Sequence, residues 1–220
     1  MKTNGKKTLT AGILLIIAFI LWTVLILCVD VRPVGQNGTD IGFAALNTWF
    51  HKLTGVHMGL YTITDWLGLV PVFICICFGA LGLCQWIKRR SLKKVDLDII
   101  LLGGYYILVI FGYLIFEMIP INYRPIPIDG AMEASYPSST TLLVLSVMPT
   151  LVFQVNRRAR SASVKTAAAA FAALFAAFMV IGRLVSGVHW LTDIVGAVFL
   201  SAGLYLLYRA SVMLLCEGCK

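Results

Sequence analysis

Charged side chains are scarce in this sequence. Only 13% of the 220 residues are Asp, Glu, Lys or Arg, whereas 60% are hydrophobic, and soluble domains average about 25% charged residues. A water-solvated surface cannot be built from this composition, so the bilayer is the expected solvent. The sequence also has no long polar stretch that could form a separate soluble domain. We therefore expect one membrane-integral domain over residues 1–220, with any chemistry placed on the membrane bundle itself.

The sequence has no cysteine in a connecting loop, which excludes a disulfide framework. Four of the six cysteines lie in apolar runs, and Cys216 and Cys219 lie in a short tail. With no second Cys or His pair near that tail, no metal site is expected. No cofactor is expected either.

Six apolar runs are long enough to cross a bilayer, which takes about 20 residues. They lie at about 8–29, 63–87, 98–118, 138–155, 166–182 and 190–212. The first is too long for a signal peptide, whose apolar region has about 7–15 residues, so it should remain as a membrane helix. The predicted fold class is all-α, a bundle of six transmembrane helices.

Residues 41–54 predict a shorter, amphipathic helix that lies in the membrane interface. Its apolar residues recur at i, i+3, i+4 and i+7, and polar residues occupy the other side; they are Leu46, Trp49, Phe50 and Leu53 against Asn47, Thr48, His51 and Lys52. We interpret His51, and His57 just beyond it, as interfacial residues with no catalytic role.

The basic residues fall on alternate loops. All but four of the 18 Lys and Arg residues lie at the termini or in 88–94 and 157–165; the exceptions are Arg32, Lys52, Arg124 and Arg183. By the positive-inside rule, a multi-pass protein of the cell membrane with both termini in the cytoplasm is expected. This rule also accounts for the net charge of +8, so no nucleic-acid partner is expected.

Polar residues that suggest chemistry lie in the outward loops. His189 and Asp193 are four apart at the start of a helix, hence on one face, where a carboxylate can orient an imidazole as a nucleophile. An Asp inside an apolar helix is late for a cap and needs a partner in lipid. The alternative is that His189 belongs to an interfacial aromatic belt and that Asp193 caps the helix.

The other outward stretches favour an anion. Pro137 and the hydroxyl residues after it mark a helix start, and a helix N-terminus favours phosphate. Arg124 and Arg183 could add bidentate donors. Either arginine alone could be a membrane anchor, but the set predicts a phosphoryl pocket that faces a histidine.

These residues resemble the type 2 phosphatidic acid phosphatase (PAP2) family, whose pattern reads K-x6-R-P, then P-S-G-H, then S-R-x5-H-x3-D. Arg124 and Pro125 match the first motif, Pro137 and Ser138 the second, and Arg183, His189 and Asp193 the third. The motifs occur in the family's order, at the outward ends of the predicted helices.

The resemblance implies a metal-independent phosphatase that acts on a lipid phosphate or lipid diphosphate through a phosphohistidine. His189 would attack phosphorus and Asp193 would orient it. The phosphoryl oxygens would be held by the remaining motif residues: Arg124, Ser138 with its backbone amide, Ser139, Thr140 and Arg183. The expected partners are a lipid phosphate substrate and membrane lipids.

The sequence departs from the family pattern at four positions. Glu117 replaces the first-motif lysine, Ser139 the glycine and Thr140 the histidine of the second motif, and Gly182 the third-motif serine. The missing histidine would have been the general acid, a role worth about 10²- to 10⁴-fold in rate. Glu117 is a possible substitute donor, as are Asp129 and Glu133.

These departures leave a second interpretation open, a non-catalytic relative that binds or moves lipid phosphates. A channel or ion transporter is less favoured, because no chain of ionisable residues runs between the two faces.

Overall fold

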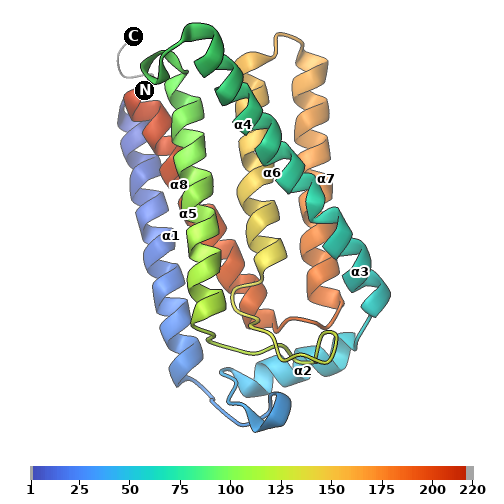
Figure 1. Cartoon of the computed structure of the whole chain (residues 1–220). Helices are drawn as coiled ribbons and strands as arrows, with labels where there is room; N and C mark the ends of the chain where they lie inside the picture. The colour runs from blue at the N-terminus through green and yellow to red at the C-terminus, as the bar shows by residue number, and fades with distance from the viewer. Residues whose placement is uncertain (1, 217–220) are drawn as a thin grey trace.

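The computed structural model describes residues 2–216 and is built from helices joined by short loops (Figure 1). The helices are α1 (Lys2–Cys28), α2 (Ala44–Thr54), α3 (Met58–Leu67), α4 (Leu69–Arg89), α5 (Leu97–Met118), α6 (Ser139–Arg158), α7 (Ala162–Val185) and α8 (Leu191–Leu215), with 3-10 turns η1 (Gln36–Gly38) and η2 (Leu92–Lys94). Six spans are long and apolar enough to cross a membrane, with α3 and α4 together making one of 32 residues. The six-helix prediction is confirmed. Cys219, of the tail pair, lies outside the described residues.

The helices extend beyond the predicted apolar runs. The first begins at Lys2 and the fifth span covers Ala162–Val185, because hydropathy marks only the part of a helix that lies in hydrocarbon. Polar and basic residues continue the same helices at their ends, where long basic side chains can reach water.

The apolar run 63–87 suggests one continuous helix for the second span, but the structure has two helices there. The span begins earlier, at Met58, and is interrupted at Gly68 between α3 and α4. Pro71 lacks the N–H that would bond the carbonyl of Leu67, which accounts for the break. In Figure 1 α3 and α4 cross the bundle obliquely, and α3 begins beside α2. The longer span thus brings α3 residues to the end of the bundle that α2 covers.

The N-terminal helix packs along the C-terminal one (Figure 1). Gly203 of α8 makes this approach close, since a Cβ there would lie 2.8 Å from Cδ1 of Ile16. Small residues at such positions allow helix backbones to approach in lipid. Nearby, Tyr136 stacks on Phe19 at 6.0 Å, and its hydroxyl hydrogen-bonds Thr23 at 2.8 Å. This contact ties the loop before α6 into the bundle.

The amphipathic helix forms as predicted and lies across one end of the bundle (Figure 1). Its polar side faces the protein: Asn47 is fully buried and donates to the Thr192 hydroxyl at 3.0 Å. Trp49 and Leu53, on the apolar side, are 59% and 67% exposed. The exposed face is therefore the apolar one, as an interfacial helix requires.

Both chain ends lie at the opposite end of the bundle from α2 (Figure 1). Asp98 is buried there and forms ion pairs with Arg157 at 3.2 Å and Arg158 at 2.9 Å. The bundle thus has a basic end, which carries the termini, and an end covered by α2 and the loop between α5 and α6.

Candidate active site

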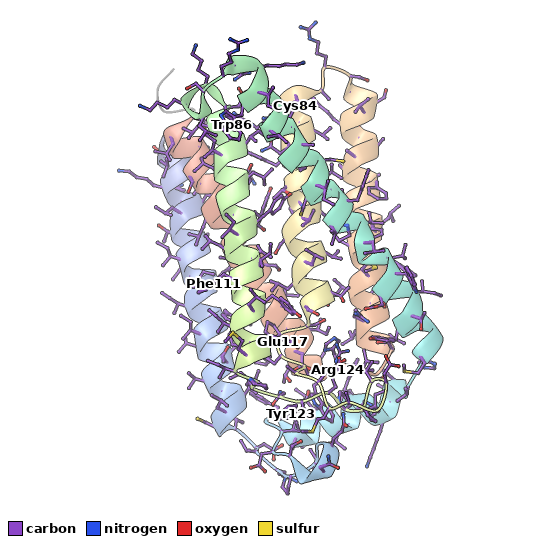
Figure 2. The ribbon with its side chains drawn as sticks, viewed as in Figure 1. Cys84, Trp86, Phe111, Glu117, Tyr123 and Arg124 are labelled. Carbon is purple, nitrogen blue, oxygen red and sulfur yellow. The ribbon has the colours of Figure 1, made fainter. Side chains whose placement is uncertain are left out.

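The predicted site residues meet at the α2 end of the bundle. A polar cavity of about 210 Å³ lies there. Residues from all three motif regions line it, and the polar ones include Glu117, Arg124, Glu133, Ser135, Ser139 and His189. Figure 2 places Glu117 and Arg124 at this end, far from Cys84 and Trp86. Four elements contribute: the end of α5, the loop after it, the start of α6 and the loop before α8.

A serine lies between the histidine and the carboxylate. Oγ of Ser135 is 3.1 Å from Nδ1 of His189 and donates a hydrogen bond to Oδ2 of Asp193. The direct distance from His189 Nδ1 to Asp193 Oδ2 is 3.7 Å, too long for a hydrogen bond. All three side chains are buried. The serine hydroxyl can therefore accept a hydrogen bond from the N–H at Nδ1 while it donates a hydrogen bond to the carboxylate.

Asp193 also caps its helix. It is the third residue of α8, its Oδ2 accepts the backbone N–H of Trp190 at 2.9 Å, and its Oδ1 lies 3.4 Å from the Asn122 amide nitrogen. The expectation that Asp193 is too late for a cap is wrong, because α8 begins at Leu191. This one carboxylate therefore caps α8 and also accepts the hydrogen bond of Ser135, whose Oγ contacts His189.

The other ring nitrogen of His189 is available. Nε2 is buried and has no hydrogen-bond partner among residues 2–216. Burial, with smaller effects of Arg124 and Arg183, lowers the pKa of His189 to about 4, although Asp193 acts in the opposite direction. The imidazole is therefore neutral near pH 7. With the proton on Nδ1, the lone pair of Nε2 is free.

The loop before His189 needs a glycine. Gly187 has φ +72°, and a Cβ there would lie 2.1 Å from the carbonyl oxygen of Gly55, so no other residue fits without strain. Nε2 of His51 lies 3.1 Å from the Gly187 carbonyl oxygen, and its ring packs on Trp190 at 5.7 Å. His51 thus supports the loop from α2, and it does not line the polar cavity.

The two arginines are buried and partly unpaired. Nη2 of Arg183 lies 3.0 Å from Oδ1 of Asp65 and also hydrogen-bonds the Thr140 hydroxyl. Nε of Arg124 lies 3.1 Å from Oε2 of Glu133. Within the described part of the chain, Nε and Nη1 of Arg183 and Nη1 of Arg124 have no hydrogen-bond partner. Buried guanidinium N–H groups left unpaired are the donors that an anion would satisfy.

Tyr61 of α3 connects the two arginines. The Arg183 guanidinium lies 4.8 Å from the centre of the Tyr61 ring and that of Arg124 lies 6.0 Å from it, distances at which a ring face attracts a cation. The ring thus lies beside both guanidinium groups, of which that of Arg124 belongs to a residue lining the polar cavity.

The three hydroxyl residues that open α6 point to different places. Ser138 donates its hydroxyl to Thr141 at 3.0 Å and its backbone N–H to the Asp193 carbonyl at 3.3 Å. Both groups expected to hold phosphate are thus engaged within the protein. Ser139 instead lines the polar cavity, and Thr140 contacts Arg183.

Two of the three suggested proton donors reach the cavity. Glu117 and Glu133 both line it. Asp129 is exposed at a turn with φ +49° and does not line the cavity.

Four residues of the site were not identified from the sequence: Ser135, Asn122, Tyr61 and Asp65. Ser135 lies two residues before Pro137, the first residue of the second motif, so its place in the sequence could have marked it as a site residue. Asp65 is an acidic residue inside an apolar run, which predicts a charged partner. No sequence pattern marks Tyr61 or Asn122, because only the fold brings them to the site.

Comparisons with known proteins identify the fold and the family of the chain. The chain aligns with a crystal structure described as the first transmembrane PAP2 type phosphatidylglycerolphosphate phosphatase from Bacillus subtilis; the TM-score is 0.62 at 16% identity, over 95% of this chain and 97% of that one. At this identity the likeness concerns the fold. No curated protein sequence matches significantly. The PAP2 superfamily model matches residues 100–214, more than half of the sequence and all three motifs. The chain is therefore a multi-pass membrane protein that belongs to the PAP2 superfamily.

Proposed function

We propose that this protein is a phosphatase of lipid phosphates or lipid diphosphates that works through a phosphohistidine on His189. The observation that carries the proposal is the buried Nε2 of His189, which has no hydrogen-bond partner within residues 2–216, on a residue that lines a polar cavity together with Arg124. Family membership supports a lipid phosphatase in general terms, and the similar structure from Bacillus subtilis is that of an enzyme named for a lipid phosphate.

The first step uses the neutral imidazole. Nε2 attacks phosphorus, the N–P bond forms, and the bond from phosphorus to the leaving oxygen breaks. Positive charge develops on the ring and is stabilised through Ser135 by the Asp193 carboxylate, 3.7 Å from Nδ1. Water then attacks phosphorus, the N–P bond breaks and inorganic phosphate leaves.

The arginines provide the anion site. In the transition state charge is spread over the phosphoryl oxygens, and fixed donors stabilise it. The N–H groups of Arg124 and Arg183 that have no partner in the described part of the chain are suited to this. The backbone N–H groups at the start of α6, where the N-cap Ser138 makes no side-chain cap, are suited to it as well. Glu133 would stay paired with Arg124, and Asp65 with Arg183, while other N–H groups of the same guanidinium groups bind the substrate.

A carboxylic acid would protonate the leaving oxygen. Thr140 cannot do so near pH 7, and its hydroxyl is engaged with Arg183. Glu117 and Glu133 line the same cavity as His189 and are the candidates, with Glu117 favoured because Glu133 is paired with Arg124.

The cavity should face the outside of the cell membrane. The termini lie at the opposite end of the bundle (Figure 1), and that end carries most of the basic residues, which favours the cytoplasm.

A specific observation favours a second function, lipid-phosphate binding without hydrolysis. The residue at the usual position of the acid is a threonine bonded to Arg183, and a carboxylate replaces the usual lysine at Glu117. Such a protein would still hold a phosphate on its arginines.

Phosphate release by the purified protein distinguishes a phosphatase from a protein that binds lipid phosphates without hydrolysis. Phosphatidic acid, phosphatidylglycerophosphate and a polyprenyl diphosphate would be offered in detergent, with His189→Ala as the control. Release by the wild type alone supports the enzyme. Alkaline quenching with a ³²P-labelled substrate should trap label on the wild type and none on His189→Ala. Binding without release in both proteins would favour the second function.

A further inference from the structure

An apolar path along α5 begins beside the polar cavity. A second cavity of about 430 Å³, lined almost wholly by apolar residues of α4, α5 and α6, shares Tyr113 and Ser139 with the polar cavity. A third, of about 340 Å³, lies between α4 and α5 and shares Cys75 and Tyr106 with the second. The three cavities therefore lie next to one another in series along α5. We call the second and third together the α4–α5 groove.

The groove reaches the other end of the bundle. Its last part is lined by Trp86 and by Leu92 of η2, and Figure 2 shows Trp86 at the end opposite Glu117 and Arg124. Along α5, the lining residues run from Tyr113 to Ile99. At 1.5 Å per residue this is about 21 Å, whereas half of the hydrocarbon core is about 15 Å. The groove therefore passes the bilayer midplane.

Glycines keep the far part of the groove open. Gly79 of α4 and Gly103 of α5 line it, and a Cβ built at either position has nothing within 4 Å. A side chain would fit sterically at both positions, so packing between the helices does not require glycine there. The space that the glycines leave forms part of the groove.

We propose that the α4–α5 groove holds the hydrocarbon chain of the substrate, and that the substrate is a single-chain polyprenyl phosphate or diphosphate whose chain crosses the midplane. This inference rests on the proposed function, because it takes the polar cavity as the phosphate site. Because the polar cavity and the groove meet at Tyr113 and Ser139, one molecule could place its head group in the first and its chain in the second. A single groove accommodates one chain, and its reach beyond one leaflet favours a long chain over the two shorter chains of a diacyl lipid.

Blocking the groove tests this directly. Gly103→Leu places a side chain in the far part of the groove, and Gly104→Leu is the matched control, since Gly104 also has open space around its Cβ but does not line the groove. For each protein, kcat/KM is measured with undecaprenyl diphosphate and with geranyl diphosphate, whose two isoprene units are shorter than the roughly 15 Å that separates Tyr113 from Gly103 along α5. The readout is the ratio of the two values.

We expect Gly103→Leu to lower the long-to-short ratio by roughly tenfold, which corresponds to about 1.4 kcal/mol of lost chain contact. Gly79→Leu, on the opposite wall, should do the same, and Gly104→Leu should leave the ratio at the wild-type value. Equal ratios in all four proteins would overturn the groove assignment while leaving the phosphatase proposal intact. If the wild type releases no phosphate from either substrate or from phosphatidic acid, the proposed function itself fails. In that case, unequal binding of the long chain by Gly103→Leu and Gly104→Leu would still support the groove.

Discussion

Ser135 separates His189 from its carboxylate: Oγ of Ser135 lies 3.1 Å from Nδ1 of His189, closer than any oxygen of Asp193. The serine hydroxyl therefore sets the tautomer, because it donates to Asp193 and can only accept from the ring. The resemblance to the PAP2 family implies direct orientation by Asp193; in this structure the orientation passes through a third residue.

Removing the Ser135 hydroxyl should lower the rate of the chemical step. In Ser135→Ala the ring loses its fixed tautomer, and since hydrogen bonds to charged groups contribute about 1.5–3 kcal/mol, kcat should fall roughly 10- to 100-fold with little change in KM. Ser135→Cys keeps the shape but has only a weak S–H donor, so it should resemble Ser135→Ala. Wild-type kcat in both variants would show that Ser135 only fills space.

His189 should remain neutral in mild acid. Burial lowers its pKa to about 4, so the ring gains its proton only as the pH falls through that value. An ordinary histidine titrates near 6.5 and would already be mostly charged at pH 5. NMR of protein with ¹⁵N-labelled histidine, with His189→Ala to assign the signal, measures this pKa. A midpoint near 6.5 would contradict the prediction.

The substrate preference should follow from Thr140. A monoester expels a poor alkoxide leaving group that needs a proton, whereas a lipid diphosphate expels a stable phosphate monoester. Without the usual acid, activity on phosphatidic acid should be lower than on a polyprenyl diphosphate, by up to about 10²- to 10⁴-fold. Initial rates of phosphate release with both substrates measure the difference.

Thr140→His should raise monoester activity more than diphosphate activity, although it also removes the hydroxyl that contacts Arg183. Equal or greater activity of the unmodified protein on phosphatidic acid would contradict the preference and would favour Glu117 or Glu133 as an efficient donor.

Arg183→Lys should weaken phosphate binding. The guanidinium holds Asp65 and Thr140 with Nη2 and leaves Nε and Nη1 for substrate; a lysine has no such fork. A loss of about 1.5–3 kcal/mol for a charged hydrogen bond lowers kcat/KM by roughly 10- to 100-fold. Arg209→Lys, at an exposed position on α8, is the matched control and should keep wild-type kcat/KM. Equal values for both variants would exclude Arg183 from substrate binding.

The site should open to the outside of the cell. In a cysteine-free background, Asp129→Cys, in the exposed turn of the α5–α6 loop, should react with an impermeant thiol reagent added to intact cells. Lys93→Cys, exposed at the opposite end in η2, should react only after the cells are opened. Labelling in the reverse order would place the site in the cytoplasm.

The sequence by itself was sufficient for the membrane architecture and for the main charged and imidazole side chains of the candidate site. Hydropathy depends on composition over about 20 residues, so each span could be located locally, and the motif spacing located Arg124, Arg183, His189 and Asp193 before any contact was known. The sequence did not predict the end residues of the helices, because polar residues continue a helix beyond its apolar part, as Lys2 does in α1. The sequence analysis also did not predict the break at Gly68 between α3 and α4.

Only the tertiary structure decided how these residues relate to one another. Ser135 lies between His189 and Asp193, and Tyr61 beside both arginines, through contacts between elements that are distant in the sequence. The same holds for the α4–α5 groove, which arises from how α4 crosses α5. Sequence spacing predicts which side chains share one helix face, since the helix repeat is fixed. It does not predict which faces meet, because that depends on how whole helices pack and on where a proline or glycine redirects one of them.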